Sequence, residues 1–123
     1  KTSKNTGLKL VLALSYSSKL EILNSVKKIA QKVADEKINP EDINEDTISK
    51  ELYTANYPDP DLLIRTSGEC RISNFLLWQI AYAELYFSPK LWPDFKKDDF
   101  FEAIIEYQGR ERRFGKTAEQ IKR

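Results

Sequence analysis

Three short stretches of the chain are apolar almost without interruption. They are residues 7–16 (GLKLVLALSY), 62–65 (LLIR) and 84–87 (ELYF). Apolar runs that lack alternation with polar residues are typical of strands buried on both faces. We therefore predict three strands, of which the first is the longest and the most apolar.

Helical periodicity follows the first of these runs. Apolar residues recur every three or four positions as far as about Glu36. Ser18 and Glu21 have the spacing of a capping box, in which the serine caps the first helical turn. The sequence therefore predicts a helix that begins near Ser18. Its apolar positions are Ile22, Leu23, Val26, Ile29, Ala30 and Val33.

Further helices are expected in the rest of the chain. Pro40 suits the first turn of a short element, and a short helix is expected around residues 47–53. Residues 73–84 (SNFLLWQIAYAE) have the composition of a buried helix capped by Ser73. A last helix is expected from about Asp98. Its expected buried positions are Phe100, Phe101, Ile104 and Tyr107.

The alternation of these strands and helices predicts an α/β fold, with a largely parallel sheet flanked by helices. The length of 123 residues suits one domain over residues 1–123. Residues 116–123 are expected to form a flexible tail beyond the last helix.

Composition excludes several classes of function. The net charge of +1, from 20 basic and 19 acidic residues, predicts no nucleic-acid partner. The chain has no histidine, which excludes catalytic triads and His-ligated metals within it. A single cysteine suits a reducing compartment and predicts a cytoplasmic location. No apolar run reaches the roughly 20 residues of a membrane span.

A dense polar segment separates the second strand from the apolar residues that follow it. It contains Arg65, Arg71 and Ser73, with Gly68 between them to permit a tight turn. Ligands of open α/β sheets bind beyond the carboxyl ends of the strands, where this segment lies. Arginine donates two parallel hydrogen bonds to phosphate oxygens, and the expected helix N-terminus would also attract an anion. The segment is therefore a candidate diphosphate site.

A purely structural interpretation of the same residues is equally compatible with the pattern. Arg65 would pair with Glu69, Arg71 with an acidic residue elsewhere, and Ser73 would only cap a helix. The segment is not a Walker motif, so its spacing alone does not decide between the two interpretations.

The stretch DLLIRTSGECRISNFLLWQIAYAELYF, with LWPDF and RERRFG after it, resembles the C-terminal half of the cis-prenyltransferases. The resemblance covers nearly the whole chain. It implies that Arg65 and the Arg71–Ile72–Ser73 motif bind the diphosphate of isopentenyl diphosphate. It implies that Glu84 serves a Mg²⁺ site. It also implies that Arg113 and Gly115 of the RFG motif reach the active site of a partner subunit in a homodimer.

The resemblance implies a prenyl-transfer reaction as well. Isopentenyl diphosphate units would be condensed with cis geometry onto farnesyl diphosphate to make undecaprenyl diphosphate, a lipid-carrier precursor for cell-wall synthesis. A lipid product of this kind allows peripheral contact with a membrane. An alternative is a non-catalytic partner subunit or structural fragment that keeps the fold. A generic phosphate-binding module would not explain LWPDF and RERRFG at the family's spacing.

Two departures from the family pattern limit what this chain is expected to do alone. The family's Asn-Tyr-Gly-Gly-Arg junction is replaced by residues 15–19 (SYSSK), which implies a less extreme backbone there. The catalytic aspartate loop of the family, of the Asp-Gly-Asn-x-Arg type, is absent from these 123 residues. The absence of methionine suggests a fragment or a processed product. We therefore expect the isolated chain to supply the isopentenyl site and to be inactive.

Two further features have ordinary explanations. Residues 98–102 (DDFFE) resemble the magnesium motif of the unrelated trans-prenyltransferases, but acidic residues also stabilise a helix N-terminus, and we predict that role here. Cys70 lies beside two arginines, which can activate a thiol, but we predict a passive residue.

Overall fold

The computed structural model describes residues 4–111. Its elements, in chain order, are α1 (Ser18–Ala34), the 3₁₀ turn η1 (Pro40–Asp42), α2 (Glu45–Ser49), β1 (Leu62–Arg65), β2 (Glu84–Phe87), the 3₁₀ turn η2 (Trp92–Asp94) and α3 (Lys97–Gln108). Within these residues no helix is long and apolar enough to cross a membrane. The expected tail at 116–123 and the RFG motif with Arg113 and Gly115 lie outside the described residues.

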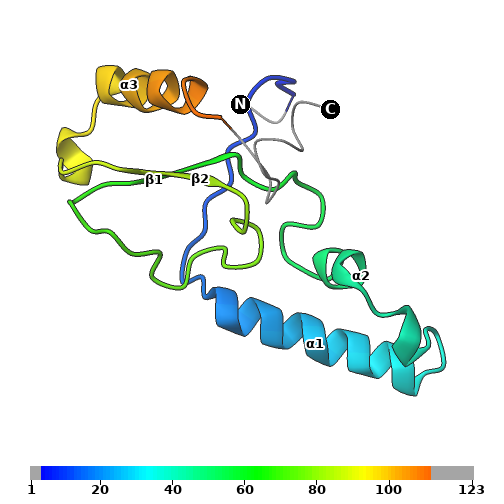
Figure 1. Ribbon diagram of the computed structural model, residues 1–123. Coiled ribbons are helices and arrows are strands. Elements are labelled where there is room, and N and C mark those ends of the chain that lie inside the picture. Colours follow the sequence, from blue (N-terminus) through cyan, green and yellow to red (C-terminus); the bar gives the residue numbers. More distant parts are fainter. Residues whose placement is uncertain (1–3, 112–123) are drawn as a thin grey trace.

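The strands β1 and β2 form a parallel pair in which Leu62 lies opposite Glu84, and Arg65 opposite Phe87. Helix α3 packs along β2, whereas α1 and α2 pack together on the other side of the strands (Figure 1). This arrangement of a parallel sheet between helices confirms the predicted α/β class. All four residues of each strand are half-buried rather than buried.

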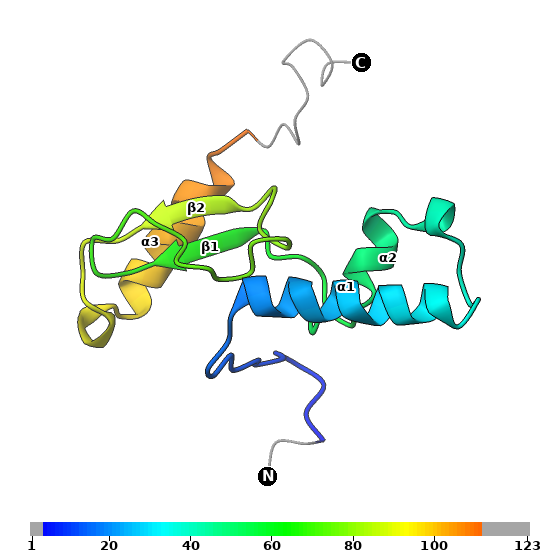
Figure 2. The ribbon, with the colours of Figure 1, turned by 90° about the horizontal axis from the view of Figure 1, so that it is seen from below.

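The predicted first strand is not a strand in the structure. Residues 8–14 run in an extended path away from the start of α1 (Figure 2), and Leu8 and Leu14 are 96% and 84% exposed. A strand buried on both faces needs neighbouring strands for its backbone groups and helices for its side chains. In the described part of the chain β1 and β2 pair only with each other, and this run joins neither of them.

The N-cap of helix α1 lies one residue earlier than the sequence suggested. Ser17 is the N-cap, and its Oγ accepts a hydrogen bond from the Leu20 N–H at 3.3 Å. Ser18 instead makes tertiary contacts: its N–H donates to the Asn74 carbonyl at 3.0 Å, and its Oγ accepts from the Leu77 N–H at 2.9 Å. The predicted capping box at Ser18 is therefore wrong, because Ser18 is used to hold the 74–77 segment.

The buried face of α1 is largely polar. Ser18, Glu21, Ser25 and Ile29 are buried, and they follow one another at helical spacing. The apolar positions Leu20, Leu23 and Val26 are instead 54%, 48% and 49% exposed. The predicted helix is confirmed, but part of its expected apolar face points to solvent.

The predicted helix over residues 73–84 is also absent, and a series of turns takes its place. Ser73, Asn74 and Leu76 have positive φ angles of 51°, 61° and 47°, which no α-helix allows. Asn74 covers the start of α1: its Oδ1 accepts from the Lys19 N–H, and its Nδ2 donates to Ser17 Oγ, both at 2.9 Å. These contacts outweigh the local helical preference, so Ser73 caps no helix.

Helix α3 begins at Lys97, within one residue of the prediction, and Asp98 and Asp99 lie in its first turn. Asp99 Oδ2 accepts a hydrogen bond from the Lys96 N–H at 2.8 Å. The acidic residues of DDFFE therefore stabilise the helix start, as predicted. The expected buried face is wrong in part, since Asp99 and Ala103 are buried. Phe100 and Phe101 are 45% and 46% exposed.

The Asp99–Lys90 ion pair gives a testable pH dependence. The hydrogen bond from Lys90 Nζ, at 2.5 Å, and the Lys96 N–H hold the pKa of Asp99 below its ordinary value of 3.8. A carboxyl whose pKa is lower in the folded state stabilises that state above the unfolded pKa and loses this contribution as the pH falls through the folded pKa. Carbon-13 NMR titration should therefore find the Asp99 pKa below 3.8.

The matched variants separate Lys90 from other charges nearby. Lys90→Ala should raise the Asp99 pKa toward its ordinary value, because the main hydrogen bond to the carboxylate is removed. Lys97→Ala should leave it unchanged, since the Lys97 ammonium lies over the Phe101 ring. Equal pKa shifts in the two variants would contradict the assignment.

Candidate functional site

The polar segment follows the carboxyl end of β1 and is anchored to the residues after β2. Ser67 and Gly68 both have positive φ angles, 74° and 67°. The Ser67 N–H donates to the Lys90 carbonyl at 2.7 Å, and the Gly68 N–H donates to the Ser88 carbonyl at 2.8 Å. Gly68 makes the tight turn possible, as the sequence suggested. The segment is thus held at the sheet end where ligands of α/β proteins bind.

The structure brings together two of the predicted site residues. Arg65 Nη1 donates a hydrogen bond to Ser73 Oγ at 3.0 Å. Arg65 is the last residue of β1, so the strand fixes where its side chain starts. The hydrogen bond therefore holds the guanidinium and the hydroxyl next to each other.

Arg71 forms an ion pair with Glu69, and their side chains are 64% and 38% exposed. Pairs this exposed contribute little to stability, because water screens them and both side chains lose freedom. A diphosphate can therefore replace Glu69 as the partner of Arg71 at little cost. Glu69 pairs with Arg71 and not with Arg65, so the structural alternative considered for these residues is wrong in that detail.

One element of the expected anion site is missing. The segment after Ser73 is not a helix, so no helix N-terminus adds its N–H groups or dipole to the site. The positive charge at this loop comes instead from the two arginine side chains. Ile72 lies between Arg71 and Ser73 and is half-buried. Cys70 is an exposed free thiol.

Glu84 lies at the other end of the strand pair. It is opposite Leu62, three residues before the Arg65–Phe87 pair, and so roughly 10 Å from Arg65 along the strands. Arg110 Nη1 donates to Glu84 Oε2 and to the Leu85 carbonyl, both at 2.9 Å. Glu106 and Glu84 together hold the pKa of Arg110 above its ordinary value. The structure therefore does not bring Glu84 together with the predicted diphosphate ligands.

The described residues do not fit a complete magnesium site. Residues 4–111 contain no group of three or more acidic or thiol side chains that could hold a metal ion. Mg²⁺ often takes one or two carboxylates, with its other ligands from substrate phosphates and water. Glu84 could supply one carboxylate only after release from Arg110. The described residues therefore supply at most part of a magnesium site.

Sequence reasoning missed a buried carboxylate at Glu21, which is 0% exposed. Its carboxylate accepts hydrogen bonds from the Tyr16 hydroxyl, from the Tyr53 N–H at 2.7 Å and from Gln79 Nε2 at 3.2 Å. Burial, and then the hydrogen bond to Glu21, raise the pKa of Tyr16. The one signal in the sequence was the spacing of Ser18, Glu21 and Ser25 on a single helix face.

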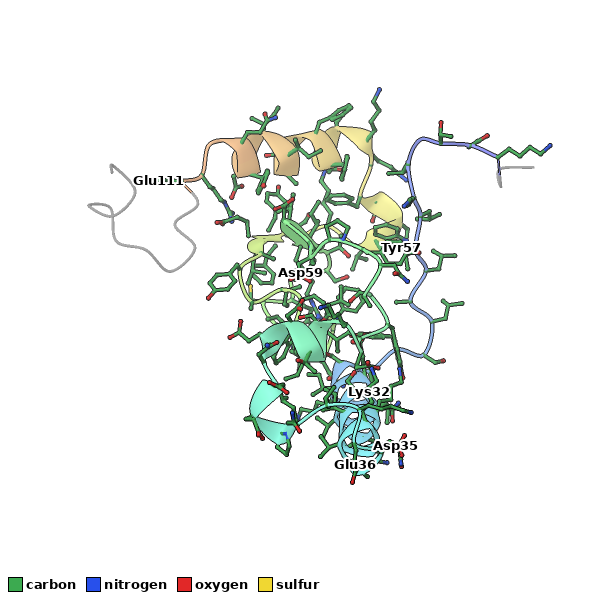
Figure 3. The ribbon with its side chains drawn as sticks, turned by 90° about the vertical axis from the view of Figure 1, so that its right-hand side faces the viewer. Lys32, Asp35, Glu36, Tyr57, Asp59 and Glu111 are labelled. Atoms are coloured by element: carbon green, nitrogen blue, oxygen red, sulfur yellow. The ribbon has the colours of Figure 1, made fainter. Side chains whose placement is uncertain are left out.

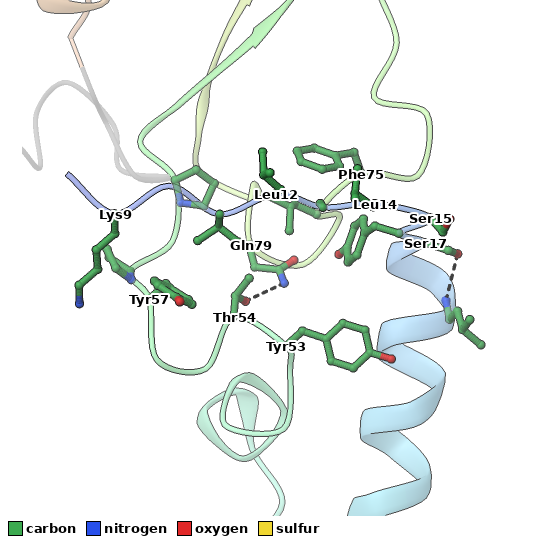
Figure 4. Close-up of a pocket in the computed structure, with 17 residues that line it drawn as sticks. Lys9, Leu12, Leu14, Ser15, Ser17, Tyr53, Thr54, Tyr57, Phe75 and Gln79 are labelled. Carbon is green, nitrogen blue, oxygen red and sulfur yellow. Dashed lines mark hydrogen bonds between the residues drawn. The ribbon is translucent and has the colours of Figure 1, made fainter. Parts of the chain in front are cut away.

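A largely apolar cavity of about 720 Å³ lies beside this cluster. The extended segment 9–17 forms one wall, and residues 53–60 and 75–79 form the others (Figure 4). Tyr57 lies near the N-terminal segment in a second view as well (Figure 3). The cavity is separate from the polar loop, since neither Arg65 nor Arg71 lines it.

Comparisons with known sequences identify the family. Residues 1–115 match the prenyltransferase family model described as "Putative undecaprenyl diphosphate synthase". An isoprenyl transferase of Porphyromonas gingivalis is 61% identical over 120 residues, which are 98% of this chain and 47% of that protein. A ditrans,polycis-undecaprenyl-diphosphate synthase of Vibrio vulnificus, named as specific for (2E,6E)-farnesyl diphosphate, is 54% identical over 121 residues. These are 98% of this chain and 48% of that protein.

Solved structures agree with this assignment. Lavandulyl diphosphate synthase from Lavandula x intermedia, in complex with dimethylallyl diphosphate, superposes with a TM-score of 0.83 at 44% identity. The superposition covers 85% of this chain and 45% of that one. A probable undecaprenyl diphosphate synthase from Campylobacter jejuni gives a TM-score of 0.72 at 40% identity, over 85% and 46% of the two chains.

The chain thus spans about half the length of the curated relatives it matches. Of this chain itself, nearly all residues (1–115) match the family model. The chain therefore belongs to the cis-prenyltransferase family, the family of undecaprenyl diphosphate synthase.

Proposed function

We propose that this chain supplies the isopentenyl diphosphate site of a cis-prenyltransferase that makes undecaprenyl diphosphate. The observation that carries the proposal is the contact between Arg65 and Ser73, next to Arg71, at the carboxyl end of β1. Two guanidinium groups and a hydroxyl match the charge and hydrogen-bonding capacity of a diphosphate. Farnesyl diphosphate is the proposed allylic partner, as the name of the Vibrio vulnificus relative states for that protein.

The proposed role of the site is orientation. Arg65 and Arg71 would hold the diphosphate of the incoming unit and so place its alkene against the allylic carbon. We propose Mg²⁺ as the cofactor of the complete enzyme. Glu84 remains a predicted ligand for that ion. The catalytic aspartate is not among these 123 residues, so the ionisation of the allylic substrate is assigned to residues outside them.

The oligomeric state and the cellular location of the protein are part of the proposal as well. We propose a homodimer, in which Arg113 and Gly115 reach the site of the partner subunit. We also propose a cytoplasmic enzyme that contacts the membrane through its lipid product. A non-catalytic subunit would have no need to keep Arg65 and Ser73 in contact, which favours the enzyme over that alternative.

Calorimetric titration of the 123-residue chain with isopentenyl diphosphate tests the proposal. Each charge-assisted hydrogen bond contributes about 1.5–3 kcal/mol, so Arg65→Ala and Arg71→Ala should each weaken binding by about 10- to 150-fold. Lys50→Ala is the matched control, because this lysine pairs with Asp46 on the distant α2. Equal weakening by Lys50→Ala would show that net charge alone attracts the ligand.

The isolated chain should not elongate a prenyl chain. With radiolabelled isopentenyl diphosphate, farnesyl diphosphate and Mg²⁺, the purified 123-residue protein should yield no product above the background of a protein-free reaction. The reason is that it lacks the aspartate loop that the family uses to bind the allylic diphosphate. Elongation that depends on Arg71 would contradict this prediction.

A further inference from the structure

Asn74, the residue directly after the Arg71–Ile72–Ser73 motif, is hydrogen-bonded to the start of helix α1 at three points. Its carbonyl accepts from the Ser18 N–H at 3.0 Å, and its Oδ1 accepts from the Lys19 N–H at 2.9 Å. Its Nδ2 donates to Ser17 Oγ at 2.9 Å. The first N–H groups of a helix have no partner within the helix. Asn74 therefore satisfies two of these groups, from a position 55 residues further along the chain.

The backbone at Asn74 has a conformation that few residues adopt. The φ angle is 61° at Asn74 and 51° at Ser73. Asparagine tolerates this left-handed region better than most other residues with a side chain. Such a conformation costs free energy and persists only where the surrounding contacts hold it. The three hydrogen bonds of Asn74 are contacts of this kind, and they fix the turn in which Ser73 lies.

The same turn is held at two further points. The Leu77 N–H donates to Ser18 Oγ at 2.9 Å, and Ser18 is 0% exposed. On the other side, Ser73 Oγ accepts from Arg65 Nη1 at 3.0 Å, at the end of β1. Ser73 is thus joined to β1 through Arg65 and to α1 through Asn74. Its place beside Arg65 depends on both connections.

We propose that Asn74 is a positioning residue for the diphosphate site, because its contacts with α1 hold Ser73 and the preceding Arg71 where they bind isopentenyl diphosphate. The inference rests on the proposed function and adds to it a link between α1 and the site through one side chain. Affinity for the ligand then depends on hydrogen bonds to Ser17 and Lys19 that are not made with the ligand.

Calorimetric titration of variants of the 123-residue chain tests this link. Asn74→Ala should raise the dissociation constant for isopentenyl diphosphate about 5- to 50-fold, because the two side-chain hydrogen bonds that hold the turn are lost. Asn74→Gly removes the same two bonds but allows the positive φ angle, so it gives the measurement where the alanine variant does not fold.

Asn24→Ala is the matched control, since it removes an asparagine side chain about two turns further along the same helix. Asn24 Nδ2 donates to the Tyr53 hydroxyl at 2.9 Å and makes no contact with the turn around Ser73. This change should alter the dissociation constant less than about twofold. Each protein is titrated under conditions in which circular dichroism shows it to be folded.

Hydrogen exchange of the unmodified chain tests the same coupling in the other direction. If the contacts of Asn74 favour ligand binding, the bound ligand must favour those contacts by the same factor. Saturating isopentenyl diphosphate should therefore slow exchange of the Ser18 and Lys19 amides, which donate to Asn74, more than that of Ala103 in α3. A residue that only stabilised the fold would give equal slowing at all three amides.

The possible results distinguish this inference from the proposed function. If the wild-type chain does not bind isopentenyl diphosphate, the proposed function fails and the role of Asn74 fails with it. If the wild-type chain binds, only the role of Asn74 is overturned by unchanged affinity in its variants, or by equal weakening in Asn24→Ala. Exchange at Ser18 and Lys19 that slows no more than at Ala103 would overturn it as well.

Discussion

Replacing Glu21 by alanine should lower the free energy of unfolding by about 3–5 kcal/mol, the largest loss we expect from any single change in the described residues. The variant removes the acceptor of three donors, the Tyr16 hydroxyl, the Tyr53 N–H and Gln79 Nε2; of these, Gln79 Nε2 keeps its other hydrogen bond, to Thr54 Oγ1. These donors come from three separate segments, so the change also releases the contacts that hold them to α1. Urea denaturation followed by circular dichroism measures the loss.

Two other substitutions separate this effect from a general loss of negative charge. Glu21→Gln keeps one acceptor oxygen and should cost less than Glu21→Ala. Glu41→Ala, at an exposed position in η1, should change the free energy of unfolding by less than about 0.5 kcal/mol. If Glu21→Ala cost no more than Glu41→Ala, the cluster would not hold the fold together.

Arg71→Ala should raise the KM for isopentenyl diphosphate about 10- to 150-fold in an active chimera, because one or more charge-assisted hydrogen bonds to the diphosphate are lost. In the chimera, the matched residues of the Porphyromonas gingivalis relative are replaced by those of this chain, at 61% identity. The KM for farnesyl diphosphate should change less than about twofold, since its diphosphate is assigned to the other part.

The informative quantity is the increase in the KM for isopentenyl diphosphate relative to the increase in the KM for farnesyl diphosphate. Lys50→Ala in the same chimera should leave both KM values unchanged. Equal increases in the KM for the two substrates would mean that Arg71 acts on the fold or on both sites. If neither KM value changed, Arg71 would not be part of the diphosphate site.

The parts of the fold that sequence reasoning predicted well depend on local patterns. The short apolar runs at β1 and β2 and the helical spacing of α1 and α3 each specify an element almost by themselves. Arg65 lies at the end of such a run, as predicted; its hydrogen bond to Ser73 was not predicted. The acidic residues in the first turn of α3 stabilise its start for a similarly local reason.

The misses depend on contacts between distant segments. Residues 7–16 have the composition of a central strand, but a strand needs neighbours that local composition cannot supply. Residues 73–84 have helical composition, yet Asn74 bonds to the start of α1 and forces positive φ angles. Glu21 has the spacing of a capping residue, but its partners lie 32 and 58 positions away. Long-range hydrogen bonds override local preference in both of the last cases.

The separation of Glu84 from Arg65 could not be read from the sequence either. The two residues are 19 positions apart, and the parallel register places them at opposite ends of the strand pair. Only the register shows that Glu84 belongs with Arg110 and not with the loop.

The most direct test of the central claim is NMR of the arginine side chains during titration with isopentenyl diphosphate. The Nε–Hε signals of Arg65 and Arg71 should shift together and saturate at one equivalent, while that of Arg110, which is paired with Glu84, should stay in place. The backbone amide of Ser73 should shift with the two arginines. Shifts confined to Arg110 or to scattered lysines, with Arg65 and Arg71 unchanged, would contradict the claim that this loop binds the diphosphate.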